Sequence, residues 1–188
     1  MNSTYYSAKD LKRKFKAIGK NVLISKKITI LGAKNISIGN NVRIDDFCIL
    51  LAKIGYLNIG SNVHIGSFSY LNASGGLNIE NFCNLSQGIK IYSKSDNYDG
   101  STITNPTFSE KFTKPIYGKV VLKKHCLLGS GTIILPNVTL NEGVVVGALS
   151  LVKDNLKKWS IYAGVPAKYI KKRKKISRLT EKRSLGEV

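Results

Sequence analysis

The chain has 188 residues, 43% of them hydrophobic, and a formal net charge of +19 at neutral pH. This length predicts one domain with its own core, and no apolar run is long enough to form a membrane-spanning helix. The first six residues lack the apolar centre of a signal peptide, so we expect a cytoplasmic protein.

The basic charge is concentrated at the two ends of the chain. Residues 9–27 hold eight Lys or Arg against one acid, and residues 168–183 hold nine against one. Such clusters attract phosphorylated small molecules or an anionic membrane surface, and they equally suit a solvated face that carries no function. Aromatic residues do not alternate with the basic ones and no nucleic-acid-binding motif is present. We therefore expect no nucleic-acid partner.

Residues 1–20 are predicted to form an N-terminal segment that precedes the main fold. Within it, Leu11, Phe15 and Ile18 recur at i, i+4 and i+7, which is the spacing of one helical face. A short basic amphipathic helix is therefore expected near residues 10–18.

A six-residue repeat occupies residues 21–91 and 118–153. In the second block it places an apolar residue at six evenly spaced positions: Leu122, Leu128, Ile134, Leu140, Val146 and Val152. Small or β-branched residues follow four positions later. A period of six fits neither an α-helix nor an isolated strand, and it indicates a repeating structural unit. We expect each hexad to form a short strand and a corner, with its first and fifth residues inside a core that successive coils share. Gly, Asn and Asp at the second to fourth places suit corners with positive φ.

The three cysteines, Cys48, Cys83 and Cys126, all occupy the fifth place of a hexad. This position predicts small, reduced core residues, and their spacing matches no zinc-binding pattern. We therefore expect neither a disulfide nor a metal site. His125, the fourth residue of its hexad, is expected to be a structural corner residue.

The hexad pattern is lost in residues 92–117, a polar insertion that contains two prolines and no histidine. Long excursions from a regular solenoid are usually functional loops. After the last hexad, residues 167–183 are predicted to form a basic C-terminal helix.

Residues 118–151 and 159–171 resemble the hexapeptide-repeat acyltransferases, and the likeness extends over roughly residues 15–175. The nearest resemblance is to sugar O- and N-acetyltransferases of the maltose, galactoside and surface-polysaccharide type. It implies a mainly β fold, a left-handed parallel β-helix, and a homotrimer. The implied reaction is metal-free acetyl transfer from acetyl-CoA to a sugar or sugar nucleotide in surface-polysaccharide biosynthesis. O- and N-acetylation both remain open, and a non-catalytic hexapeptide-repeat scaffold is the alternative.

The resemblance also suggests where catalysis occurs. The resembling enzymes use a loop histidine as base, and its position falls here at Asp96 or Asn97. His64, which projects outward at the sixth place of its hexad, matches an acceptor-site position and is the candidate base. Asp96 is predicted to orient His64, bind the acceptor or act as the base itself, unless it only forms a turn. Asn84, Asn97 and Tyr98 are the predicted acceptor-binding residues.

Acetyl-CoA is implied by the same resemblance to lie in a groove between subunits along the last coils. The matching positions are Ser130, Gly147, Ala148, Lys153, Lys168 and Lys171. The small residues leave room for the pantetheine arm. Lys168 and Lys171 stand where the family has arginines near the CoA phosphates, and they supply point charges rather than bidentate contacts.

Overall fold

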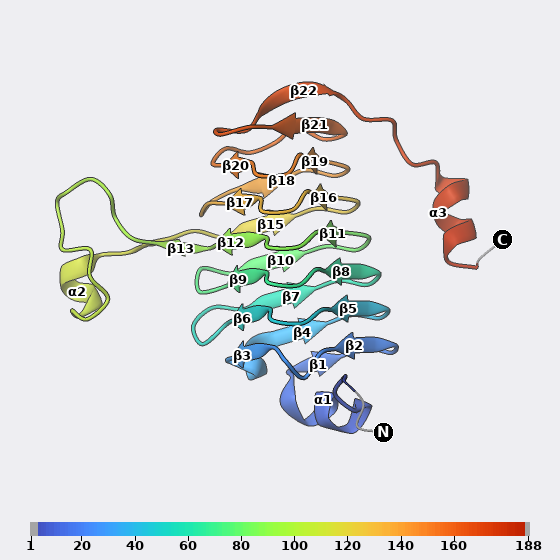
Figure 1. Cartoon of the computed structure of the whole chain (residues 1–188), viewed down its shortest axis with the longest axis horizontal. Coiled ribbons are helices and arrows are strands. Elements are labelled where there is room, and N and C mark those ends of the chain that lie inside the picture. Colours follow the sequence, from blue (N-terminus) through green and yellow to red (C-terminus); the bar gives the residue numbers. More distant parts are fainter. Residues whose placement is uncertain (1–3, 187–188) are drawn as a thin grey trace.

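The computed structural model of the chain describes residues 4–186. Successive coils of the chain stack along one axis (Figure 1). Their strands form three parallel sheets, which are the sides of a prism. The chain passes through the first, second and third sheets in turn in every coil, so each sheet gains one strand per coil. The stacked coils that the hexads predict, and the parallel β-helix that the family resemblance implies, are confirmed.

The first sheet contains β1 (Ala17–Ile18), β4 (Ile36–Ile38), β7 (Leu57–Ile59), β10 (Leu77–Ile79), β15 (Val120–Leu122) and β18 (Thr139–Leu140). The second contains β2 (Val22–Ile24), β5 (Val42–Ile44), β8 (Val63–Ile65), β11 (Asn84–Leu85), β16 (Leu127–Leu128), β19 (Val145–Val146), β21 (Ser160–Ala163) and β22 (Lys168–Lys172). The third contains β3 (Thr29–Leu31), β6 (Ile49–Leu51), β9 (Tyr70–Asn72), β12 (Lys90–Tyr92), β17 (Ile133–Ile134) and β20 (Leu151–Val152).

The hexad positions determine which side chains form the core. Leu128 and Ile134, at first positions, are fully buried, and so is Thr132 at a fifth position. The three cysteines are also buried and reduced, as predicted. Burial raises the pKa of the Cys48 thiol to about 11, so this residue behaves as a small apolar core group rather than as a nucleophile.

The corners place the fourth residue of many hexads in the left-handed region, and not only where it is Gly or Asn. Phe47, Phe68, Phe82 and His125 have φ values between 60° and 64°. Each such conformation costs about 1–2 kcal/mol in a residue other than glycine. Stacking between coils offsets part of this cost, with ring centroids 5.1 Å apart for Phe47 and Phe68 and 4.9 Å apart for Phe82 and His125.

The N-terminal end of the prism is covered by α1 (Ala8–Lys14), whose first turn is capped by the Ser7 side chain. Leu11 and Phe15 are buried in the core, as the helical spacing predicts. The helix expected near residues 10–18 is displaced, however: it ends at Lys14, because Ala17 and Ile18 pair with β4 as the first strand of the first sheet. A 3-10 turn, η1 (Ala33–Asn35), follows β3.

The C-terminal end differs from the predicted helix over residues 167–183. Residues 168–172 form β22, which pairs antiparallel with β21, and the helix is the shorter α3 (Arg178–Ser184). The turn between β21 and β22 contains Gly164 at φ 103°, and it returns the chain along the open edge of β21. Hydrogen bonds to that edge favour strand over helix in this segment.

Residues 94–117, named the arm below, project away from the prism between β12 and β15 (Figure 1). Their base is an antiparallel pair, β13 (Lys94–Ser95) and β14 (Ile116–Tyr117), and they include α2 (Glu110–Thr113). Lys94 and the Tyr117 hydroxyl both contact the Glu110 carboxylate. No helix within residues 4–186 has the length and apolar character that a membrane crossing requires.

Candidate active site

A column of polar side chains lies on the outer face of the second sheet. Arg43, His64 and Asn84 are register partners on β5, β8 and β11. Because alternate residues of a strand face opposite sides, the residue next to each buried Ile or Leu points outward. His64 therefore projects outward, as its place in the hexad predicts, and it lies in one column with Arg43 and Asn84.

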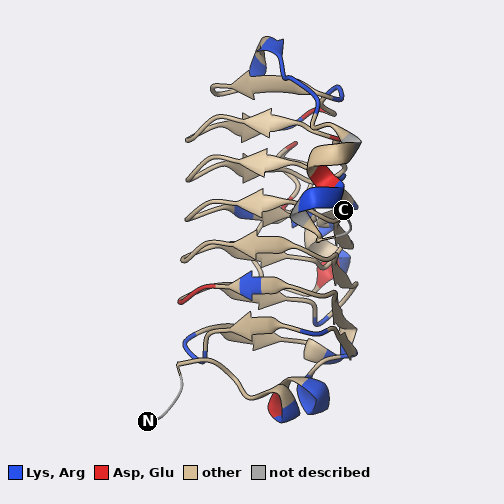
Figure 2. Ribbon diagram, turned by 90° about the vertical axis from the view of Figure 1, so that its right-hand side faces the viewer, with Lys and Arg blue, Asp and Glu red and all other residues tan. Residues whose placement is uncertain are grey.

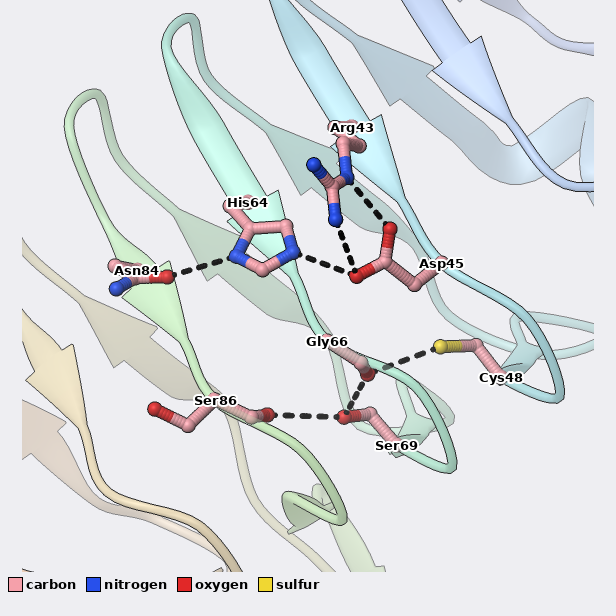
Figure 3. Close-up of polar contacts among 8 residues, drawn as sticks. All are labelled: Arg43, Asp45, Cys48, His64, Gly66, Ser69, Asn84 and Ser86. Carbon is pink, nitrogen blue, oxygen red and sulfur yellow. Dashed lines mark hydrogen bonds and ion pairs between the residues drawn. The ribbon is translucent and has the colours of Figure 1, made fainter.

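His64 is held on both sides of its ring (Figure 3). Its Nε2 lies 2.8 Å from Asp45 Oδ2, and its Nδ1 lies 3.0 Å from Asn84 Oδ1. Arg43 donates two hydrogen bonds to the same Asp45 carboxylate, at 2.7 and 3.2 Å. The bond from Arg43 is the main cause that lowers the pKa of Asp45, and the bond from His64 adds to it. Asp45 is therefore ionised at neutral pH and fixes the orientation of His64.

These contacts determine what His64 can do within one chain. A general base needs a free lone pair directed at the reacting group. Both ring nitrogens of His64 are already in contact with neighbours. The contact of Nε2 with Asp45 involves a charged group and is therefore the stronger of the two. For His64 to accept a proton from a substrate, the weaker contact between Nδ1 and Asn84 must open.

Asp96 lies elsewhere in the chain. It lines a cavity of about 540 Å³ where the arm leaves the third sheet, together with Tyr98 and Tyr92. Asp96 and Tyr98 therefore line the same cavity. The carboxylate that contacts His64 in the same chain is Asp45, rather than Asp96. Asn97 accepts a hydrogen bond from the Asp99 backbone N–H at 3.1 Å and so stabilises a turn of the arm.

Asp45 was not predicted as a site residue, although the sequence carries a signal for it. It belongs to a stacked column at the second place of the hexads, whose other members include Ser25, Gly66, Ser86, Gly129 and Gly147. A Cβ on Gly66 would lie 2.8 Å from the Ser86 backbone, so successive coils approach closely in this column. An acid in a column otherwise filled by glycine or serine, one coil before an outward histidine, indicates a carboxylate–histidine pair.

Ser86 is a further member of this column with a polar side chain. Its carbonyl lies 3.5 Å from Ser69 Oγ, while its own hydroxyl points away from Ser69 (Figure 3). The side chain is half-buried, so the hydroxyl lies at the corner between the second and third sheets, two residues beyond Asn84.

The residues predicted to bind the cofactor lie along the C-terminal coils. Ser130 and Ala148 are exposed at the corners after β16 and β19, and the Leu149 N–H donates to the Ser130 carbonyl at 2.9 Å. Gly147 adjoins them in the stacked column. Lys153 is exposed beyond β20, and Lys168 and Lys171 are exposed on β22. The structure therefore brings Ser130, Gly147 and Ala148 to one corner of adjacent coils.

His125 occupies a structural environment, as expected. Its side chain is buried and stacked on Phe82, and Nε2 lies 3.4 Å from a Glu181 carboxylate oxygen on α3. Within residues 4–186, no group of three His, Cys, Asp or Glu side chains is arranged to hold a metal ion.

No family model matches the chain. It is 42% identical over 161 residues to the dTDP-4-amino-4,6-dideoxy-D-glucose acyltransferase of Escherichia coli, and the match covers 86% of this chain and 84% of that protein. It is also similar to AntD, an N-acyltransferase from Bacillus cereus, in a complex with dTDP-4-amino-4,6-dideoxyglucose and coenzyme A. The identity is 44%, the TM-score is 0.93, and both chains are covered completely.

The solved AntD structures include variants of a serine and of an aspartate that lies ten residues further along. A maltose O-acetyltransferase from Clostridium difficile 630 shares the fold, with a TM-score of 0.63 and 21% identity over 93% of this chain and 79% of that one. The identity to the Escherichia coli acyltransferase over most of both proteins, together with the hexad-built prism, shows that the chain belongs to the hexapeptide-repeat acyltransferases and is an acyl-transferring enzyme.

Proposed function

We propose that this enzyme transfers the acyl group of acetyl-CoA, or of another short acyl-CoA, to the amino group of a nucleotide-linked amino-deoxy sugar. The observation that carries the proposal is the likeness to AntD over the whole of both chains, because that protein is an N-acyltransferase in complex with such a sugar and coenzyme A. The Escherichia coli relative is named for the same sugar. Both favour N- over O-acylation.

In this reaction the sugar nitrogen attacks the thioester carbonyl carbon. A C–N bond forms, the C–S bond breaks, the nitrogen gives up one proton, and the coenzyme A thiolate takes up one. The products are an amide and the free thiol. A neutral amine is already nucleophilic, so it needs a weaker base than a hydroxyl does. The lack of a histidine in the arm is consistent with an amine acceptor.

Ser86 and Asp96 are the residues we assign to the reacting amine, with His64 as the further catalytic candidate. Ser86 and Asp96 are ten residues apart, the same spacing as the serine and aspartate varied in AntD. A carboxylate can hold the amine and receive its proton, and a hydroxyl can orient it. Asn84, Asn97 and Tyr98 are the proposed contacts to the sugar.

The two catalytic groups would come from different copies of the chain. Ser86 precedes β12 and Asp96 follows it, so within one chain that strand, about 10 Å long, lies between them. The arm also exposes large apolar side chains, Tyr98 by 84% and Phe112 by 58%. Protruding apolar groups favour burial against a partner. A homotrimer in which the arm of one protomer covers the Ser86 corner of the next would satisfy both requirements.

The acyl-CoA would lie along the C-terminal coils of the same interface. Ser130, Gly147 and Ala148 are small residues, which lets a pantetheine arm approach the backbone of this corner. Lys153, Lys168 and Lys171 lie beyond it and supply positive charge for the CoA phosphates.

The wider setting that we propose is surface-polysaccharide biosynthesis in the cytoplasm, where nucleotide-linked sugars are substrates. Figure 2 shows Lys and Arg at the two ends of the prism, on α1 and around β22. This distribution supports peripheral contact with an anionic membrane, because basic clusters are attracted to acidic headgroups.

A thiol-release assay tests the proposal directly. With acetyl-CoA as donor, dTDP-4-amino-4,6-dideoxyglucose should be turned over at least about a hundredfold faster than dTDP-glucose, which offers only hydroxyls. Asp96→Asn and Ser86→Ala should each lower kcat by about tenfold or more. Equal rates for both sugars, or no thiol release with any amino sugar, would refute the proposed activity.

Mixing the two inactive variants tests the shared site. Suppose that Asp96 of one copy and Ser86 of its neighbour form one site. In trimers assembled from equal amounts of Asp96→Asn and Ser86→Ala chains, about a quarter of all sites then carry both wild-type residues. Activity should therefore reappear on mixing after subunit exchange. A mixture no more active than its components would show that both groups act from one chain.

A further inference from the structure

We propose that the C-terminal end of the prism carries a second binding site, whose ligand is the base and phosphates of a nucleotide. The site is a cavity of about 1040 Å³ beyond the last complete coil, named the cap cavity here. Its lining includes Lys158, Trp159, Tyr162, Tyr169, Lys172 and Arg173.

The cavity exists because the second sheet is longer than the other two. The first sheet ends with β18 and the third with β20, whereas the second continues through β21 and β22. In complete coils the inner face of each sheet is covered by the other two. On β21 and β22 that face is formed by Ser160 and Tyr162 with their register partners Lys172 and Tyr169, and all four line the cavity. An inner face without opposite walls remains open to a ligand.

The aromatic residues of the cap cavity can accept a planar base. Tyr162 is buried and meets Tyr169 edge-on, with ring centroids 5.8 Å apart. Tyr169 itself is 54% exposed, so a face of its ring is free to stack. Aromatic side chains are common stacking partners of nucleobases, and every base offers a π-face to them.

The charged residues of the cavity can accept phosphate. No Asp or Glu contributes to its lining. Within residues 4–186, Lys158, Lys172 and Lys175 take part in none of the ion pairs. Their charges are therefore not neutralised by a carboxylate and are available to an anion.

Arg173 adds a cation whose position is already fixed. Its Nη1 donates to the carbonyls of His125 at 2.7 Å and Gly143 at 3.1 Å, and its guanidinium lies 5.8 Å from the Trp159 ring centroid. A preorganised guanidinium loses little freedom on binding. A fixed guanidinium, lysines outside the ion pairs and an exposed ring together match a nucleotide better than a plain anion.

This site is separate from the lysines assigned to coenzyme A. Lys168 and Lys171 pair in register with Ala163 and Ile161, so they face away from the cap cavity, whereas Lys172 faces into it. Lys171 and Lys172 are thus neighbours of equal charge on opposite faces of one strand, which provides a matched pair for mutation. The same nucleotide chemistry occurs in free ADP, in a dTDP sugar and in the ADP end of coenzyme A.

The experiment uses Trp159, the only tryptophan in the chain, as a reporter inside the cavity. Titrating the full-length protein with ADP or dTDP should change its tryptophan emission in a saturable way. Lys172→Glu should weaken this binding about tenfold or more, because an unpaired like charge then faces the phosphates. Lys171→Glu should leave it within about twofold, since its side chain lies on the far face. Tyr169→Ala should weaken it as well, by removing the stacking ring.

Each outcome decides the proposal. Absence of a saturable change at millimolar nucleotide, or equal weakening by both glutamate variants, would overturn it. Inorganic pyrophosphate binding as tightly as ADP would show that the base plays no part and would overturn the nucleotide assignment. Coenzyme A binding that Lys172→Glu weakens in parallel with ADP would identify the co-substrate as the source. Coenzyme A binding that Lys172→Glu does not affect would identify a free nucleotide. None of these results depends on the proposed acyl acceptor.

Discussion

Replacing Asp45 with Asn removes the charge that holds Arg43 and His64 together while nearly preserving the shape of the side chain. The carboxylate accepts two bonds from Arg43, at 2.7 and 3.2 Å, and contacts His64 Nε2 at 2.8 Å. Hydrogen bonds to charged groups contribute about 1.5–3 kcal/mol each where they are well shielded. Here the Arg43 side chain is 56% exposed and that of His64 is 39% exposed. Solvent screening therefore reduces the expected total loss to about 1–2 kcal/mol.

The effect should depend on pH in a defined direction. The pKa of Asp45 is lowered from its ordinary value of 3.8, chiefly by the hydrogen bond from Arg43. A carboxyl whose folded-state pKa is lowered contributes stability that is present above the unfolded pKa and is lost as pH falls through the folded pKa. Wild type should thus be more stable than Asp45→Asn at pH 7, and the difference should shrink below about pH 4 as wild type itself becomes protonated.

Thermal unfolding at equal protein concentration measures this difference. For a domain of this size, the expected loss corresponds to a fall in Tm of about 2–8 °C at pH 7. Asp154→Asn is the matched control, because Asp154 is exposed and makes no hydrogen bond or ion pair within the described residues. Its Tm should stay within about 1 °C of wild type. Equal Tm values for Asp45→Asn and wild type at pH 7, or a difference that grows on acidification, would refute the reasoning.

Three further predictions concern the core, the thiols and the base. Leu128→Ala should lower the free energy of unfolding by about 2–5 kcal/mol in denaturant titrations. Leu149→Ala, at a side chain that is 76% exposed, should change this free energy by less than about 0.5 kcal/mol. Similar losses in the two variants would contradict the assignment of Leu128 to the core. The thiols should resist a thiol-specific reagent at neutral pH until denaturant is added. Burial raises the pKa of Cys48 to about 11, and the hydrogen bond with Cys83, together with burial, raises the pKa of Cys126. Rapid labelling of the native protein would contradict this prediction. His64→Ala should reduce kcat by about a hundredfold if His64 is the base, and a loss of less than about threefold excludes that role.

The six-residue period predicts most of the fold because the rule that it expresses is local and repeated. From β1 to β20 each strand is only two or three residues long. Each corner brings the first residue of the next hexad to the inner side, so Leu128 and Ile134 enter the core for the same reason. Residues 168–172 lie outside this rule. Their basic composition is compatible with a helix, but the free edge of β21 offers hydrogen bonds that only the assembled sheet creates.

The site could be predicted in part because stacking in phase brings together residues about one coil apart in sequence. His64 and Asn84 are register partners for this reason. The contact of Asp45 with His64 could not be predicted in the same way. Asp45 lies at a corner rather than on a strand, and the contact crosses from one coil to the next. The periodicity predicts where each Cα atom lies. The direction of a side chain at a corner depends in addition on the space that the side chains of the neighbouring coil leave free.

The six-residue repeat does not predict where Asp96 lies relative to His64, because Asp96 belongs to the arm and the arm has no hexads. The arm leaves the prism after β12, whereas His64 and Ser86 lie on and just beyond the second sheet, before β12 begins. Because β12 lies between Ser86 and Asp96 in one chain, we propose that a second chain supplies one of them. The two residues assigned to the reacting amine are therefore close in sequence, and they lie on opposite sides of β12 in the protomer. For that reason, mixing two inactive variants tests the mechanism more sharply than either variant does alone.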